Sequence, residues 1–202
     1  MSKTNLLKTW KDNEYKAFSI REIMEINNKN SKPWVFEALN KLDEQNLIKK
    51  SKKSNLNLYE LNTENILSWS ALQKIEDSQN TNFSKLKIIN KIISNINTSN
   101  YCLIVFGSYA DDTATKNSDI DIVILAETEE TIKKIKPQIN EIKLETIEEL
   151  DVHYITTKEF IELLLNKEEN LGKQILKKHK IFFNENIYFN ILKEAHQHGF
   201  RN

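Results

Sequence analysis

The sequence predicts an α+β protein with two unlike parts, and three patterns of apolar residues lead to this class. Near the N-terminus, apolar residues recur at helical spacing, and a short alternating segment typical of a β-hairpin follows them. In the middle of the chain, residues 101–106 and 119–125 have the composition of buried strands. The later apolar residues return to helical spacing. We therefore expect a small mixed sheet flanked by helices, with a helical C-terminal extension over residues 157–202.

The composition argues against several classes of protein. Of the 202 residues 39% are hydrophobic, without the long apolar run of a membrane span. A single cysteine excludes a disulfide framework and a cysteine zinc cluster. With three glycines and no GxGxxG or GxxxxGK[ST] motif, a dinucleotide-binding or P-loop protein is not expected. The N-terminal MSKTNLLKTW lacks the apolar stretch of a signal peptide, so we expect a cytoplasmic protein without membrane association.

The formal net charge of zero conceals an uneven distribution. Residues 1–65 contain 12 Lys and Arg against 9 Asp and Glu, whereas residues 66–202 contain 17 against 20. Four of the N-terminal lysines lie within five residues: Lys49, Lys50, Lys52 and Lys53. Neutrality therefore does not exclude nucleic acid or nucleotide as a ligand, but it requires that such contacts be local.

Two helices are predicted in the N-terminal part. Ser19 and Glu22 have the spacing of a capping box, which marks the start of a helix. The apolar residues of this helix that we expect to face inward are Ile20, Ile23, Met24 and Ile26. After a polar break, Ser31 is a second candidate cap, with Pro33 in the first helical turn. The predicted buried stripe of the second helix is Val35, Ala38, Leu39 and Leu42.

A β-hairpin is predicted after the second helix. Asn46 suits the left-handed conformation at which that helix would end. Residues 47–50 and 56–61 are the expected strands, and Ser51–Asn55 the expected turn. Helices followed by a lysine-rich hairpin resemble a winged helix-turn-helix domain, here over residues 1–65. The resemblance implies DNA contacts from Lys32, Trp34, Lys41, Lys49, Lys50, Lys52 and Lys53. The alternative is a solvated lysine loop on a small domain that contacts protein only.

Residues 66–82 are predicted to connect the two parts by a helix. Apolar residues from Ile66 to Ile75 have helical spacing, and the polar stretch Asp77–Asn82 is the expected helix–helix connection. A further helix is predicted up to about Ile96. In the C-terminal half, helical patterns cover residues 129–143, interrupted by Pro137, and then residues 158–165, 168–178 and 185–196.

The pattern with the clearest chemistry follows the strand at residues 101–106. Gly107 and Ser108 come next, then an expected polar loop over residues 109–118, and then the second strand from Asp119. Alternation places Asp119 and Asp121 on the same side of that strand, about 7 Å apart. Asp151 opens a third expected strand over residues 150–155. Neighbouring carboxylates on a buried strand repel unless a cation lies between them, and Mg²⁺ is the expected cation.

The string GSYA, the later SDIDIVIL and the third strand aspartate together resemble the DNA polymerase β-type nucleotidyltransferases, especially the minimal prokaryotic branch. The resemblance covers about residues 85–156, within a predicted core of residues 83–156. It implies that Gly107, Ser108 and Ser118 contact a nucleoside triphosphate. It further implies that Asp119, Asp121 and Asp151 are catalytic and hold two Mg²⁺ ions. The implied reaction transfers a nucleoside monophosphate, AMP from ATP, to a protein or nucleic-acid acceptor.

This sequence departs from the family pattern directly after the Gly-Ser turn. An Arg and a Gly usually follow, whereas Asp111 and Asp112 stand here. Aspartate tolerates unusual backbone angles, and Lys116 is expected to offset the added negative charge. Two functions remain open. One is a nucleotidyltransferase with a DNA- or partner-binding winged helix. The other is a DNA-binding transcriptional regulator or antitoxin-like protein whose nucleotidyltransferase fold is not catalytic.

Overall fold

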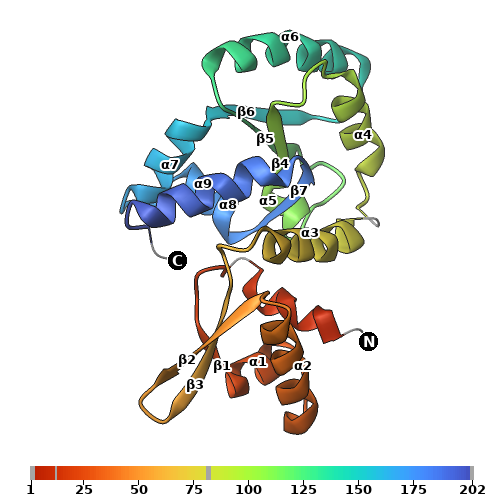
Figure 1. Ribbon diagram of the computed structural model, residues 1–202. Coiled ribbons are helices and arrows are strands. Elements are labelled where there is room, and N and C mark those ends of the chain that lie inside the picture. Colours follow the sequence, from red (N-terminus) through yellow and green to blue (C-terminus); the bar gives the residue numbers. More distant parts are fainter. Residues whose placement is uncertain (1–2, 12, 81–82, 201–202) are drawn as a thin grey trace. The chain divides into compact units, whose positions relative to one another are not determined.

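The computed structural model describes residues 3–11, 13–80 and 83–200 (Figure 1). The chain divides into two compact units, Met1–Ile75 and Glu76–Phe200, and the boundary falls inside helix α3 (Ile66–Asn80). The polar residues Asp77 to Asn80 continue this helix, so the connection predicted there is wrong over those four residues. Residues 81–82, the end of the predicted connection, lie outside the described residues.

The N-terminal unit combines helices with a small antiparallel sheet. Its elements before α3 are the 3₁₀ helix η1 (Lys3–Trp10), β1 (Phe18–Ser19), α1 (Ile20–Ile26), α2 (Lys32–Glu44), β2 (Ile48–Lys53) and β3 (Leu56–Leu61). The strand order is β1-β3-β2, and both pairings are antiparallel. No sequence pattern predicts β1, which is only two residues long and pairs with β3 at the edge of the hairpin.

The predicted helix starts and buried stripe are confirmed. The backbone N–H of Glu22 donates to Ser19 Oγ at 3.3 Å, and the Ser19 N–H donates to the Glu22 carboxylate at 2.7 Å, which completes the capping box. The four predicted core residues of α2 are all buried. Ile26, however, is 46% exposed, because it lies at the last position of α1, beyond the buried face.

The hairpin turn is shorter than predicted. Lys53 pairs with Leu56, so the loop is reduced to Ser54 and Asn55, and Ser51 to Lys53 belong to β2. Ser54 has a φ of 55°, as one of the primed two-residue turns requires. Asn46, with a φ of 59°, has the predicted left-handed conformation after α2.

The C-terminal unit contains the predicted mixed sheet. Its strands are β4 (Tyr101–Phe106), β5 (Ile120–Ala126), β6 (Leu150–Thr156) and β7 (His179–Phe183), in the order β6-β5-β4-β7. β5 and β6 are parallel, whereas β4 is antiparallel to both β5 and β7. The helical extension predicted over residues 157–202 therefore contains a strand that was not predicted, since residues 179–183 form an edge strand of the sheet beside β4.

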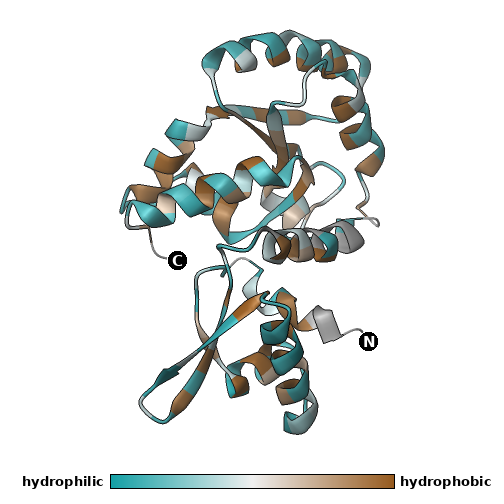
Figure 2. Cartoon of the chain, viewed as in Figure 1, coloured by the Kyte–Doolittle hydropathy of each residue, from teal (hydrophilic) through white to brown (hydrophobic). Residues whose placement is uncertain are grey.

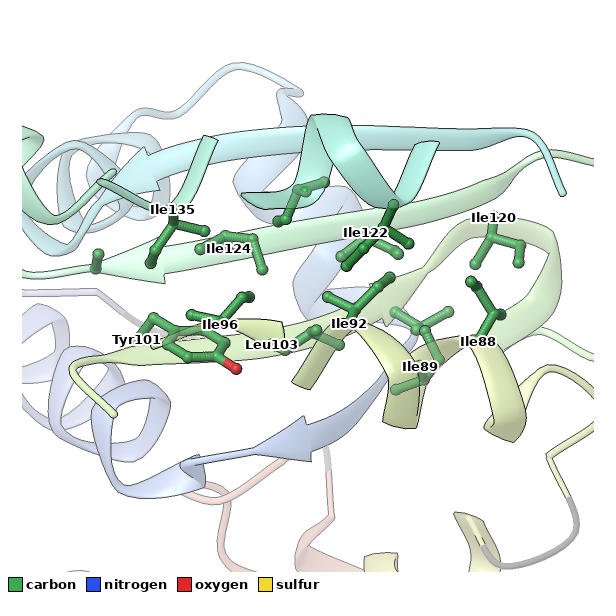
Figure 3. Close-up of a cluster of buried hydrophobic side chains, with 14 of the residues drawn as sticks. Ile88, Ile89, Ile92, Ile96, Tyr101, Leu103, Ile120, Ile122, Ile124 and Ile135 are labelled. Carbon is green, nitrogen blue, oxygen red and sulfur yellow. The ribbon is translucent and has the colours of Figure 1, made fainter. Parts of the chain in front are cut away.

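Helices cover both faces of this sheet. They are α4 (Leu86–Asn95), α5 (Gly107–Ala110), α6 (Glu129–Glu145), α7 (Thr157–Leu165), α8 (Leu171–Lys177) and α9 (Glu185–Gln197). One face packs against α4 and α6, and Ile88, Ile122 and Ile135 are members of the hydrophobic cluster on this face (Figure 3). On the strands of this unit hydrophobic colouring predominates, whereas the helices carry both kinds of residue (Figure 2). α7 and α9 contact the strands from the other face.

Helices α5 and α6 can be compared directly with the sequence predictions. Tyr109 and Ala110 are buried residues of the single-turn helix α5, so the loop predicted from residue 109 begins only after Ala110. α6 buries Ile132, Ile135, Ile139 and Ile142 as its spacing predicted, and Pro137 lies within it. Among the described helices, none is both long and apolar enough to cross a lipid bilayer.

Candidate active site

Three aspartates gather where β5 and β6 begin. Asp121 of β5 is the register partner of Asp151 of β6, and Asp119 directly precedes β5. Because Ile120 and Ile122 belong to the core beneath α4 and α6, strand alternation turns Asp121 toward the opposite face of the sheet. The structure thus brings Asp121 and Asp151 together across adjacent parallel strands, as the sequence predicted.

Asp121 lies in an unfavourable electrostatic environment. Burial raises the pKa of its carboxyl group, and the negative charges of Asp151 and Asp119 raise it further. His153 acts in the opposite direction and lowers it by a smaller amount. A carboxylate whose charge is opposed by burial and by two neighbouring acids is a place where a cation would be stabilised.

His153 lies beside Asp151, two residues further along β6 and on the same face of the strand. Its Nε2 is 3.3 Å from Asp151 Oδ2, and its ring centroid is 5.7 Å from that of Phe106 at the end of β4. About half of the Asp151 side chain remains exposed (55%). His153 therefore orients the Asp151 carboxylate while leaving one side of it open to solvent.

Gly107 brings the backbone of α5 against Asp121. Its φ is +64°, and a Cβ added at this position would lie 2.2 Å from Asp121 Oδ2. Any other residue here would be strained both by its backbone angle and by contact with the carboxylate. Glycine is therefore required if the turn after β4 is to reach the aspartates.

Ser108 lies in α5, and Ser118 lies near the end of the loop that joins α5 to β5. The backbone oxygen of Ser108 accepts from the N–H groups of Thr113 at 2.9 Å and Ala114 at 3.1 Å. Ser118 Oγ accepts from the Thr115 N–H at 2.9 Å. Both serine side chains are half-buried, and these bonds fold the intervening loop back on itself.

The two acidic residues that depart from the family pattern are paired with lysines from the C-terminal segment. Lys180 Nζ lies 2.7 Å from Asp112 Oδ1, and Lys178 Nζ lies 3.3 Å from Asp111 Oδ1. The expectation that Lys116 offsets these charges is wrong, because Lys116 is exposed and has no ion pair within the described part of the chain. Asp112 has a φ of 59°, as its tolerance of unusual backbone angles suggested.

Lys180 does more than neutralise Asp112. Its Nζ also donates to the backbone oxygens of Tyr109 at 3.0 Å and Ala110 at 3.2 Å, which are at the C-terminal end of α5. Its side chain is only 15% exposed. Sequence reasoning missed Lys178 and Lys180; the short run of Ile181, Phe182 and Phe183 directly after the two lysines was the available signal of a strand.

The donor chemistry of the three aspartates fits a hard divalent cation, which prefers carboxylate oxygens. Within residues 3–11, 13–80 and 83–200, however, no three His, Cys, Asp or Glu side chains already converge as a set of metal ligands. Asp119 and Asp151 are both exposed, at the open side of the cluster. A cavity of about 470 Å³ borders these two residues and the loop before β6.

The lysines predicted to contact DNA lie on two faces of the hairpin. Alternation along β2 separates Lys49 from Lys50, and Lys49 pairs with Glu64 at 2.9 Å. Lys50 Nζ lies 5.6 Å above the Phe36 ring of α2. Lys52 and Lys53 are exposed beside the turn, and neither has an ion pair among the described residues.

The α2 residues predicted to contact DNA are Lys32, Trp34 and Lys41. Lys32 and Lys41 are exposed, whereas Trp34 is half-buried with Lys29 Nζ 5.2 Å above its ring. These three residues belong to α2, whereas the four predicted lysines of the hairpin belong to β2.

Comparison with known proteins gives one match to a family. Residues 86–183 match the nucleotidyltransferase domain family, from the first residue of α4 to the last residue of β7. No curated protein matches the chain. A solved structure described as a toxin–antitoxin with AMP-PNP aligns over 55% of this chain and 86% of its own, with 19% identity and a TM-score of 0.35. The matched segment contains the Gly-Ser turn, the three aspartates, Lys178 and Lys180. This segment is thus matched as a nucleotidyltransferase domain.

Proposed function

We propose that the C-terminal unit transfers a nucleoside monophosphate, AMP from ATP, to a hydroxyl group of a protein or nucleic-acid acceptor. The observation that supports this most is the approach of the Gly107 backbone to the Asp121 carboxylate, next to Asp151. A phosphate-binding turn and a set of carboxylates are thereby within reach of one triphosphate. The match of residues 86–183 to the nucleotidyltransferase domain supports the same reaction.

Each residue has a distinct role in this proposal. Asp119, Asp121 and Asp151 would hold Mg²⁺, which supplies charge neutralisation for the phosphates and the transition state. Gly107 allows the backbone to approach the triphosphate. The Ser108 hydroxyl and amide contact the outer phosphates, and Ser118 positions the loop before β5 against the triphosphate. The acceptor hydroxyl bonds to the α-phosphorus, the bond to the pyrophosphate oxygen breaks, and Asp151 takes the hydroxyl proton.

The pairing of Asp111 and Asp112 favours this activity over the non-catalytic alternative. Two unpaired acids beside the turn would repel a triphosphate, but both carboxylates have lysine partners. Lys180 also holds the end of α5, so the turn keeps its conformation without the usual Arg and Gly.

The test is transfer of label from α-³²P-ATP, in the presence of Mg²⁺, to the proteins and RNA of a cell extract. We expect label transfer by the wild type and none by Asp119→Asn with Asp121→Asn. The matched control is Glu127→Gln with Glu141→Gln, which removes two exposed carboxylates elsewhere in the same unit and is expected to retain transfer. Absence of transfer by the wild type, or equal transfer by the aspartate variant, would support the DNA-binding regulator instead.

We further propose that the N-terminal unit is a winged helix-turn-helix that binds duplex DNA. This proposal is supported by the sequence of α1, α2 and the β2–β3 hairpin along the chain and by the exposed lysines at the turn. Because Lys49 is paired with Glu64 and Lys50 lies over Phe36, Lys52 and Lys53 are expected to contribute most of the phosphate contact.

Lys52→Ala with Lys53→Ala should weaken duplex binding and reduce the slope of log Kd against log salt by about 1 per lysine. Fluorescence anisotropy of a labelled duplex over a salt series measures both quantities. Lys133→Ala with Lys158→Ala removes the same charge from exposed positions of α6 and α7 and should leave both unchanged. An unchanged slope in the hairpin variant would exclude the hairpin as the DNA contact.

A further inference from the structure

A second cavity lies on the face of the sheet opposite the aspartates. It has a volume of about 710 Å³. Its lining comes from the segment before α4, from α5 and the loop after it, and from β7: Phe83, Ser84, Lys85, Tyr109, Asp112, Ala114, Thr115, Lys116 and Lys180. Phe83, Tyr109 and Ala114 belong to, or pack against, the core between the sheet and helices α4 and α6. Asp121 faces the other way, so this cavity is separate from the proposed transfer site.

The floor of this cavity is aromatic. Phe83 and Tyr109 are in an edge-to-face arrangement with their centroids 6.1 Å apart, and Phe83 packs against Phe182 at 4.9 Å. Tyr109 is buried, and Phe83 is half-buried with part of its surface at the cavity. Such a floor offers a planar ring the edges of fixed aromatic side chains. Lys85 Nζ lies 5.9 Å over the Tyr109 ring, and Lys180 Nζ lies 5.7 Å over the Phe83 ring.

The walls of the cavity are cationic, with three lysines against one aspartate. Lys180 is fully engaged by Asp112 and two backbone oxygens, so it contributes a fixed charge and no further hydrogen bond. Lys85 is only loosely compensated, since its Nζ lies 3.9 Å from Glu148. Lys116 is exposed and has no ion pair in the described part of the chain. Two lysines are therefore available to an anion.

We propose that this cavity binds a free nucleotide, with the base against Phe83 and Tyr109 and the phosphates at Lys85 and Lys116. The volume lies within the range of small-molecule sites, about 300–1,000 Å³. An aromatic floor with adjacent ammonium groups matches the two halves of a nucleotide, a planar ring and a phosphate anion. Because lysines supply the charge, binding here requires no divalent cation. The site is independent of the proposed transfer reaction and would exist in a non-catalytic protein.

The experiment is isothermal titration of the full chain with ADP in EDTA at low salt. Without divalent cations the three aspartates repel a nucleotide, so the second cavity is the expected site, with one equivalent bound. Lys85→Ala with Lys116→Ala should weaken ADP binding by about tenfold for each lysine. Lys133→Ala with Lys158→Ala, which changes the net charge equally, should leave it within about twofold.

Further titrations show which part of ADP and which residues of the protein are responsible for binding. Adenosine alone and pyrophosphate alone should each bind more weakly than ADP. Lys116→Glu, at an exposed loop position that cannot disturb the core, should weaken binding at least as much as one alanine substitution. Asp119→Asn with Asp121→Asn should not weaken it. The proposal is overturned if ADP does not bind in EDTA, if pyrophosphate binds as well as ADP, if only an oligonucleotide binds, or if the aspartate variant rather than the lysine variants loses binding.

Discussion

Lys180→Met is the substitution for which the structure allows the most definite prediction. Lys180 Nζ donates to the backbone oxygens of Tyr109 and Ala110 and pairs with Asp112. Methionine keeps most of the volume of the side chain but none of its donors. The two residues whose oxygens lose their partner are each only 7% exposed, so water has limited access to replace the lysine.

The magnitude follows from these contacts. A hydrogen bond from a charged donor contributes about 1.5 kcal/mol at the low end of its range, so loss of the two backbone contacts removes about 3 kcal/mol. The ion pair with Asp112 adds less than about 1 kcal/mol, because the Asp112 side chain is 84% exposed. We therefore expect Lys180→Met to lower the free energy of unfolding of the C-terminal unit by about 3 kcal/mol.

Urea denaturation can resolve the two units of this chain. All three tryptophans, Trp10, Trp34 and Trp69, belong to the N-terminal unit, so their fluorescence follows that unit, while circular dichroism also follows the C-terminal unit. The matched control is Lys177→Met. Lys177 pairs with Glu169 at 2.8 Å, but both side chains are more than half exposed, so a loss below about 1 kcal/mol is expected. Equal destabilisation by the two variants would refute the role assigned to the backbone contacts of Lys180.

Two further predictions concern Gly107 and Asp121. Gly107→Ala should destabilise the C-terminal unit by about 2–3 kcal/mol in urea, because it combines a positive φ with a contact on the Asp121 carboxylate. Gly199→Ala, where φ is +98° but nothing lies within 4 Å of the added Cβ, should lose only the part due to the backbone angle, and an equal loss would exclude the contact. Asp121→Asn should stabilise the unit at pH 7 in EDTA. An aspartate with a raised pKa opposes folding only when it is ionised, so this gain is expected to fall as the pH drops toward its ordinary value of 3.8. Melting temperatures of both proteins from pH 7 to pH 4 measure the gain, and a gain that grows toward acid pH would contradict the reasoning.

The central strands and the aspartates could be predicted because their signals are local. Residues 101–106 are continuously apolar, and β4 has those bounds. Alternation from Ile120 to Ile124 fixes which side of β5 carries Asp121, since a one-residue shift would bury the acid and expose the isoleucines. The same reasoning placed Asp151 on a third strand, and the parallel register then brought it beside Asp121.

The features that sequence reasoning missed depend on contacts between distant residues. β7 is five residues long, and its partner β4 precedes it by more than 70 residues. Nothing within Lys-His-Lys-Ile-Phe-Phe shows that β4 has a free edge to pair with, so no strand is predicted between the helical patterns that end at residue 178 and resume at residue 185. Lys116 is close to Asp111 and Asp112 in sequence, whereas their actual partners are Lys178, directly before β7, and Lys180 within β7.

The two ion pairs at the departure from the family pattern are not equivalent, and the difference bears on the transfer site. Lys178 and Asp111 are exposed, so their pair does little beyond reducing the local negative charge. Lys180 is nearly buried and is bonded to the backbone at the end of α5, the helix that begins at Gly107. Asp112, at a positive φ, follows directly after that helix and fixes the position of the ammonium group. The substitution of two acids for the usual Arg and Gly therefore changes the charges around the turn while a lysine from β7 maintains its geometry. Because that geometry brings Gly107 against Asp121, β7 is structurally part of the proposed site although it contributes no residue to the chemistry.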